Sequence, residues 1–536
     1  MLLICRHPPV DRNLALSRMS LESTPPNGRA MIAFLPRKAE AGGSASDIRI
    51  LVGVLCILAL ALALTVTTLS RDNFWIDELS SLYFSDPSKS LRTLALTIWP
   101  VESNPPLYYL YLYAWRLLIP SADESSIRAA SLIPAVLACL SPLVYSSRVM
   151  AYERRIAVVL LMSCSYGLLY YATEARGYAL LLFFAINVTF LFLSAMHSLR
   201  FDAGSLRRRL VLLGVFSAGA AWTHFFGILL AASVFSVLLL AAVVLRRNII
   251  LVGVAGLLTG AAAVLWPAMQ FAYIHEIATG YWFNAFPWGS VVLEAKSFAF
   301  MTFGYKWSII LIVGLTVPSV IYTAGKRISN KELLVLAIAA FAILFAALSL
   351  YVPLFFSRYF LVLLPAIYIL VAEAIGDAAG RLFARPAPVY FGILLGFAIA
   401  LSVSWPIFVR GDREDWRQPA LVVNSMPACA GASIFVVAGA PDDGDPGFLY
   451  GHYLNPQMNV RLIPIQSAAA IEPSEWTAVN RMGCPVKIWG GHIEGPQMEE
   501  LMAQFRKIAP NHIVEPFRKS FLLVARNKGG VTDPAQ

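Results

Sequence analysis

The sequence predicts an all-α polytopic membrane protein with a small soluble α/β domain at its C-terminal end. Of its 536 residues, 58% are hydrophobic and 14% are charged, whereas an ordinary soluble domain is about 45–50% apolar and about 25% charged. The mean hydropathy is +0.66. Apolar runs close to the roughly 20 residues that cross a bilayer recur along the chain, and they stop near residue 408.

The polar tail (residues 1–48) precedes a first apolar run that extends from Ile50 to Leu69. That run exceeds the roughly 7–15 residues of a secretory signal core, so we expect an uncleaved span that also directs insertion. The net charge of +10 does not indicate nucleic acid, because most basic residues lie in short segments between apolar runs. In that position they report orientation in the membrane.

Eleven apolar runs are predicted to span the membrane. They lie near 49–70, 128–147, 156–172, 177–197, 210–223, 227–245, 248–270, 307–325, 333–352, 359–379 and 388–408. A twelfth run, "LYYLYLYAWRLLI" (107–119), would give only about 20 Å of helix, which is too short for a hydrocarbon core of roughly 30 Å. Its tyrosines and Trp115 favour the membrane interface. We therefore predict an interfacial helix within a first external loop at 71–127.

Basic residues indicate the orientation. The segments that share a side with the N-terminal tail carry 14 Lys and Arg, and the longer segments on the other side carry fewer; the first group comprises 148–155, 198–209, 246–247, 326–332 and 380–387. Because cytoplasmic loops are enriched in Lys and Arg, the N-terminus is predicted to be cytoplasmic. The C-terminal domain would then be exported across a bacterial inner membrane to its outer side.

This orientation collects the unusual polar residues on the outer side: Asp77, Glu78, Glu102, Arg128, Arg176, His224 and Arg358. Each has a plain explanation by itself, because carboxylates in loops are solvated, arginines at helix ends snorkel and histidines pack among aromatic rings. The arginines, however, oppose the charge bias that orients the chain. Their convergence on one face favours a site for an anionic substrate.

The order of these clusters is similar to that in a known group of enzymes. The chain carries "VESNPPLYY" (101–109), "SSIRAASLIPAVLA", "YATEARGYALLL", "SRYFLVLLPA" and "DREDWRQPA" (412–420). Over about residues 49–410 it resembles the integral-membrane glycosyltransferases of the protein O-mannosyltransferase and aminoarabinose-transferase superfamily, which have the GT-C fold. It also looks like the bacterial branch that moves galacturonic acid onto lipopolysaccharide.

The resemblance implies a mechanism. Such enzymes take a sugar from a polyprenyl phosphate and pass it, with inversion, to an acceptor on the outer side, using a first-loop carboxylate as base. By position, Asp77 matches that base and Glu78 its acidic neighbour. Glu102 stands where many members have Asp, and Asn104 replaces their histidine. The acceptors of such enzymes include lipid A, core oligosaccharide, glycans and proteins.

The basic residues follow the same pattern. Arg128, Arg176 and Arg358 match arginines of the resembling motifs and are expected to bind the donor phosphate, because its developing negative charge needs fixed cations. His224 is a possible substrate-binding residue. The nearby carboxylates could hold a divalent cation, but no ligand set has diagnostic spacing, so no cofactor is assigned.

Residues 409–536 are predicted to form the α/β domain. "ASIFVVAGA" (432–440) and "SFLLVARN" (520–527) favour buried strands, and "PQMEELMAQFRKIA" (496–509) favours a helix with Pro near its start. Cys429 and Cys484, the only cysteines of this region, are predicted to form a disulfide after export. The sequence leaves open whether the domain is a lid, an acceptor-binding element or a structural cap.

The main alternative is a multi-span transporter or lipid flippase. Transporters usually carry ionisable groups near the bilayer midplane on broken helices in repeated halves. We expect no charge in mid-span and find no pair of interrupted helices. The sequence therefore favours the glycosyltransferase, without specifying which sugar or acceptor it uses.

Overall fold

The computed structural model describes most of the chain. The described residues are 45–102, 104–270, 288–303, 329–349, 356–382, 414–438, 446–465, 470–491, 495–508 and 510–525, with a few isolated positions between 314 and 399. Residues 50–536 form one compact unit.

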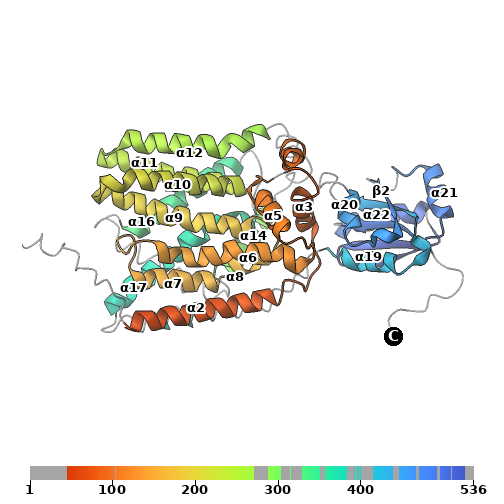
Figure 1. The fold of residues 1–536 in the computed structure, drawn as a ribbon, viewed down its shortest axis with the longest axis horizontal. Helices are drawn as coiled ribbons and strands as arrows, with labels where there is room; N and C mark the ends of the chain where they lie inside the picture. The colour runs from red at the N-terminus through yellow and green to blue at the C-terminus, as the bar shows by residue number, and fades with distance from the viewer. Residues whose placement is uncertain are drawn as a thin grey trace, which may run out of the picture. The chain divides into compact units, whose positions relative to one another are not determined.

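Long apolar helices dominate this unit, and α9, α10, α11 and α12 run side by side (Figure 1). The long helices are α2 Ala45–Val66, α6 Glu124–Leu140, α7 Tyr152–Ser163, α8 Tyr166–Ala172, α9 Tyr178–Phe201, α10 Ala203–Thr223, α11 Phe226–Leu245, α12 Ile249–Met269, α14 Trp288–Phe303, α16 Asn330–Ser349 and α17 Leu364–Leu382. Helix α9 is apolar on all faces and almost wholly buried, whereas most residues of α2 and α12 are not buried inside the protein. A helix that exposes apolar side chains over its length is suited to contact with lipid.

Seven described helices are long and apolar enough to cross a membrane, and an eighth span results if α7 and α8, bent by 55° at a short break, are counted as one. These helices confirm the polytopic membrane fold. The bent pair corresponds to the predicted span 156–172, and α10 covers 210–223. The predicted spans 307–325 and 388–408 lie outside the described residues apart from isolated positions, so the number eleven stays a prediction.

The first loop folds into short helices. They are α3 Ile76–Phe84, α4 Leu91–Thr93, the π-helical η1 Leu94–Ile98, the 3₁₀ turn η2 Trp99–Val101 and α5 Leu107–Leu118. The run left out of the spans is thus a helix of 12 residues. Tyr108, Tyr109 and Leu112 are buried against the protein while the apolar Leu117 and Leu118 are exposed, and the location of this helix at the membrane interface stays a prediction.

Helix α17 carries two carboxylates, Glu373 and Asp377, toward the end of the predicted span 359–379 rather than at its middle. Arg154 of α7 pairs with Glu373 and, at 2.8 Å, with Asp377. Lys331 of α16 is 2.6 Å from Asp377. Paired charges avoid much of the penalty of an isolated charge in a low-dielectric interior, so these helices can tolerate them.

The C-terminal region is an α/β domain, as predicted. Its five-stranded sheet has the order β2-β1-β3-β5-β4, in which β1 pairs in parallel with β2 and β3, and β5 pairs antiparallel with β3 and β4. The elements are α19 Arg417–Asn424, η7 Pro427–Cys429, β1 Ser433–Ala438, α20 Pro446–Gly451, η8 Pro456–Met458, β2 Arg461–Ile465, α21 Pro473–Arg481, β3 Val486–Gly491, α22 Gly495–Ile508, β4 His512–Phe517 and β5 Ser520–Ala525. Strands β1 and β5 and helix α22 confirm the predicted elements.

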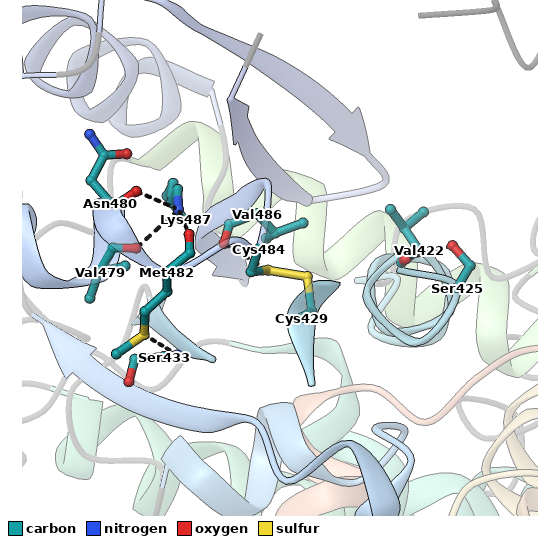
Figure 2. Close-up of a disulfide and its surroundings, with 10 residues drawn as sticks. All are labelled: Val422, Ser425, Cys429, Ser433, Val479, Asn480, Met482, Cys484, Val486 and Lys487. Atoms are coloured by element: carbon teal, nitrogen blue, oxygen red, sulfur yellow. Dashed lines mark hydrogen bonds between the residues drawn. A yellow bond between two sulfur atoms is a disulfide. The ribbon is translucent and has the colours of Figure 1, made fainter. Parts of the chain in front are cut away.

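The predicted disulfide is present and joins Cys429, beside α19, to Cys484, just before β3 (Figure 2). Next to it, the ammonium group of the buried Lys487 donates to the backbone carbonyls of Val479 and Met482 at 3.0 and 2.9 Å. These carbonyls lie at the C-terminal end of α21, where cations satisfy unpaired carbonyl groups.

The C-terminal domain and the first loop share one hydrophobic core, in which Phe74, Leu79 and Tyr109 belong to the same cluster as Trp416 and Tyr450. Polar contacts cross the same boundary. The side-chain amide of Asn73 donates to the carbonyl of Glu414 at 2.9 Å, and the backbone N–H of Phe74 donates to the Tyr453 hydroxyl at 2.7 Å. The core therefore fixes the first loop against the C-terminal domain.

Candidate active site

The acidic pair lies in the first turn of α3, where carboxylates interact favourably with the helix dipole. The two side chains have different surroundings. Glu78 is completely buried, whereas the side chain of Asp77 is 27% exposed. Two residues that the sequence presents as equivalent are therefore separated into an interior group and a group within reach of substrate.

Glu78 is held by Arg128 of α6 in a bidentate pair, with Nε–Oε1 at 2.8 Å and Nη2–Oε2 at 2.6 Å. Its Oε1 also accepts from the backbone N–H of Ala175 at 2.9 Å. The other N–H groups of Arg128 donate to the carbonyls of Leu69, Asp72 and Asn73. A guanidinium has five N–H donors, and all five are used here. This geometry favours a positioning role for both residues over contact with a phosphate.

Asp77 lies between two arginines from distant parts of the chain. Its Oδ2 is 3.6 Å from Nη2 of Arg176 and 3.7 Å from Nη1 of Arg358. Arg176 is anchored to α3, because its Nη1 donates to the Asp77 carbonyl at 3.1 Å. Both charge contacts are longer than a normal hydrogen bond. The Asp77 carboxylate is therefore close to both cations without a short hydrogen bond to either of them.

Glu102 forms a second buried acidic position, just after η2. Its Oε1 accepts from the Tyr109 hydroxyl at 2.9 Å and from the backbone N–H and side-chain amide of Asn104 at 3.1 and 2.9 Å. Burial, followed by the nearby charge of Glu102, raises the pKa of Tyr109 well above its usual value, so the phenol keeps its proton. The charge of Glu102 also acts on Arg176.

His224 occupies the junction between α10 and α11 and is buried. Its Nδ1 accepts from the backbone N–H of Phe226 at 3.3 Å. Burial, followed by the charges of Arg176 and Arg358, lowers the pKa of His224 to about 3. The imidazole is therefore neutral near pH 7, with its proton on Nε2.

Two tyrosines beside these residues were not identified from the sequence. The rings of Tyr178 and Tyr359 lie 5.6 and 5.5 Å from the ring of His224, and the guanidinium of Arg358 lies over Tyr359 at 5.5 Å. Both tyrosines follow the predicted arginines within two positions, in "RGY" and "RY". That spacing is the signal by which they could have been found.

A cavity of about 330 Å³ opens beside Arg358. Its lining contains aromatic residues, carboxylates, two cations and one serine: Trp75, Tyr170, Tyr171, Phe356, Glu174, Glu294, Glu414, Arg358, Lys519 and Ser357. Cavities of about 300–1,000 Å³ are typical of small-molecule sites. Among the described residues, no group of three His, Cys, Asp or Glu side chains is placed to hold a metal ion.

The helical bundle, the short-helix first loop and the α/β domain define a polytopic membrane protein of the GT-C fold. No family model and no curated protein sequence matches the chain. The chain is similar in structure to ArnT, the aminoarabinose transferase, from Cupriavidus metallidurans in the apo state, with a TM-score of 0.55 and 13% identity over 88% of this chain and 97% of that one. For ArnT bound to undecaprenyl phosphate the TM-score is 0.52, with 14% identity over 89% and 98% of the two chains.

The archaeal oligosaccharyltransferase AglB from Archaeoglobus fulgidus is less similar. Its TM-score is 0.46, with 12% identity over 90% of this chain and 75% of that one, which is too low to support a structural argument. The similarity to ArnT shows the fold of this chain, and it confirms the GT-C architecture that the sequence motifs predict.

Proposed function

We propose that the protein is a membrane glycosyltransferase. It moves a sugar from a polyprenyl phosphate donor to an envelope acceptor on the outer side of the bacterial inner membrane, with inversion at the anomeric carbon. The acceptor is lipid A, core oligosaccharide, another glycan or a protein. One observation carries the proposal: the partly exposed carboxylate of Asp77 lies between Arg176 and Arg358, and Arg358 lines a cavity. The binding of undecaprenyl phosphate by ArnT, which has the same fold, supports a donor of this class.

The arrangement suits the chemistry of the transfer. The acceptor atom forms a bond to the anomeric carbon while the bond between that carbon and the phosphate oxygen breaks. Asp77 takes the proton of the acceptor, as a positioned general base does. The electron pair of the broken bond leaves on the phosphate, whose charge Arg358 and Arg176 stabilise.

The remaining residues hold these groups in place. Glu78 and Arg128 fix the start of α3 and thereby the direction of Asp77. Glu102, with Tyr109 and Asn104 as its partners, is a second carboxylate whose charge acts on Arg176. We assign Glu102 to orienting Arg176 or the acceptor.

The proposed topology places these groups at one membrane surface. Residues 1–48 are cytoplasmic, residues 49–408 form the membrane domain, and residues 409–536 lie in the periplasm or outside the cell. A donor with a long isoprenoid tail would keep the tail in lipid while its phosphate and sugar meet Arg358 and Asp77 at the interface.

The charges of α17 do not favour the alternative function, a transporter or flippase. Those charges are joined to α7 and α16 by ion pairs, as a structural network would be. A test that measures covalent transfer, with purified protein and labelled undecaprenyl-phosphate sugar, separates the two functions.

In that assay, Asp77→Asn is expected to transfer sugar at least ~100-fold more slowly, because general-base assistance is worth about 10²–10⁴-fold in rate. It should still bind the donor, since a base acts mainly in the transition state. Arg358→Ala should weaken donor binding as well, because its phosphate partner is charged throughout.

Asp86→Asn is the matched control, because Asp86 follows α3, is likewise partly exposed, lies 3.8 Å from Lys89 and accepts from the backbone N–H of Ser88 at 3.0 Å. Transfer at the wild-type rate by Asp77→Asn would show that its carboxylate is merely solvated. Mass spectrometry of envelope lipids and glycans from a deletion strain would identify the acceptor.

A further inference from the structure

The cavity beside Arg358 is not made by the membrane domain alone. Glu414 and Lys519, both from the C-terminal α/β domain, belong to its lining together with Trp75 of the first loop. Glu414 and Lys519 lie 105 residues apart in the sequence, yet the fold brings both to the lining of this cavity. Charged side chains are usually exposed to solvent, so the presence of two of them at this cavity calls for a functional explanation.

Glu414 is held rigidly. Its carbonyl accepts a hydrogen bond from the Asn73 side chain. The next residue, Asp415, is hydrogen-bonded to Arg518 and to Ser520, the two sequence neighbours of Lys519. The N–H of Asp415 donates to the carbonyl of Arg518 at 2.8 Å, and its carbonyl accepts from the Ser520 hydroxyl at 2.7 Å. Trp416 then enters the domain core with no exposed surface. The backbone of Glu414 is therefore fixed relative to the turn that carries Lys519.

Lys519 occupies an unusual backbone position. It is the second residue of the two-residue turn between β4 and β5, and its φ is 53°. Such turns prefer Gly, Asn or Asp, because a β-carbon is strained in the left-handed region. The turn alone thus gives no reason for a lysine, whereas the cavity that its side chain lines does.

Polar contacts hold the part of the C-terminal domain that carries Glu414 and Lys519 against the rest of the protein. The Tyr453 hydroxyl donates to Oε1 of Glu124 at 2.6 Å, and Arg417 pairs with the same carboxylate. Arg518, beside Lys519, has Nη2 at 3.9 Å from Asp72 of the first loop. These contacts hold the turn against the first loop.

We propose that Glu414 and Lys519 bind the hydroxyl groups of a glycosyl substrate, so that the C-terminal domain is part of the substrate site. A carboxylate accepts and an ammonium donates hydrogen bonds to hydroxyls, and such charge-assisted bonds are the stronger ones. Trp75 and Phe356 line the same cavity and supply apolar surface beside these two charged groups. This inference rests on the proposed glycosyl transfer, and the sugar is that of the donor or that of the acceptor.

The test uses the full-length protein with the variants Lys519→Gly and Glu414→Gln. Glycine suits the left-handed turn, so Lys519→Gly should unfold at a temperature no lower than that of the wild type. A folding defect then cannot explain a loss of activity. Lys519→Arg should keep much of the activity, and Lys507→Met, at an exposed lysine of α22, is the control for loss of a positive charge.

The probes are undecaprenyl phosphate alone and the same lipid linked to mannose, glucose, aminoarabinose, galacturonic acid or N-acetylhexosamine, with envelope material from a deletion strain as acceptor. We expect kcat/KM to fall about tenfold or more in both variants, as for loss of a hydrogen bond to a charged group. Binding of undecaprenyl phosphate alone should not change. Weaker binding of the sugar-linked lipid would assign the site to the donor sugar, and a raised KM for the acceptor would assign it to the acceptor.

Wild-type kcat/KM in both variants would overturn this inference while leaving the proposed function intact. Loss of undecaprenyl phosphate binding in both variants would also overturn it, because the residues would then act on the phosphate. Absence of transfer by the wild-type protein from all the sugar-linked lipids would overturn the proposed function and this inference together.

Discussion

Arg128 provides the sharpest test of how the site is built. The substitution Arg128→Met replaces the side chain with a shorter, apolar one and removes its charge and its five N–H donors. Glu78 then stays completely buried without its cation, and the carbonyls of Leu69, Asp72 and Asn73 lose their donors. Removing one partner of a buried ion pair destabilises a protein by about 3–5 kcal/mol, and we expect a loss of stability in that range.

The double variant Glu78→Gln/Arg128→Met should be more stable than Arg128→Met alone. It leaves no uncompensated charge, and the Gln carbonyl can still accept from the N–H of Ala175. Because residues in direct contact show coupling energies of about 0.5–3 kcal/mol, we expect coupling near the upper end. Thermal unfolding in detergent, followed by size-exclusion chromatography of the heated samples, measures these differences.

Binding of undecaprenyl phosphate to the folded fraction is the second measurement, and Arg92→Met, at an exposed arginine of the first loop, is the control. If Arg128→Met unfolded at the wild-type temperature but no longer bound undecaprenyl phosphate, the positioning role would be refuted. Arg128 would then contact the donor phosphate, as the sequence motif suggests.

Three further predictions concern stability and topology. Cys429→Ser should destabilise the C-terminal domain by about 4 kcal/mol, as expected for the 55-residue separation that the disulfide closes. In the wild type, Cys429 and Cys484 should resist alkylation until a reductant is added, and labelling of either one without reductant would contradict this. The pKa of His224 is lowered to about 3, so at pH 5 the unfolded state binds a proton that the folded state does not. About 2 kcal/mol of stability should therefore be lost from pH 7.5 to pH 5. His224→Asn should make the stability less dependent on pH over this range. Reporter fusions after residues 152 and 204 should report cytoplasm and those after 290 and 450 the exported side, and a cytoplasmic signal at 450 would remove the active-site argument.

The sequence predicts the membrane helices well because their apolar runs are long and their composition is extreme. It predicts the C-terminal sheet less completely. Strands β2 and β4 contain Pro464 and Pro516, which weaken a strand pattern but are tolerated at the sheet edges that both strands occupy. Strand β3 ends in Gly490 and Gly491, which weaken the strand pattern of the sequence in the same way.

The candidate site shows a different limit. The sequence brings forward Asp77, Arg176 and Arg358, and the structure places them together. It cannot separate Asp77 from Glu78, because which of two adjacent carboxylates is buried depends on Arg128, fifty residues away. Nor does any local pattern identify Glu414 and Lys519 as cavity residues, since only the packing of the C-terminal domain against the first loop brings them there.

The shared core of the first loop and the C-terminal domain has a consequence for biosynthesis. Asn73 and Glu414 are 341 residues apart, so at about 5–20 residues per second the ribosome needs roughly 20–70 s to deliver the second after the first. During that interval Phe74, Leu79 and Tyr109 lack the partners that cover them in the finished protein. The nascent chain therefore holds an incomplete, hydrophobic first loop until the C-terminal domain has been made, and we expect the first loop to reach its native conformation only after that domain has folded.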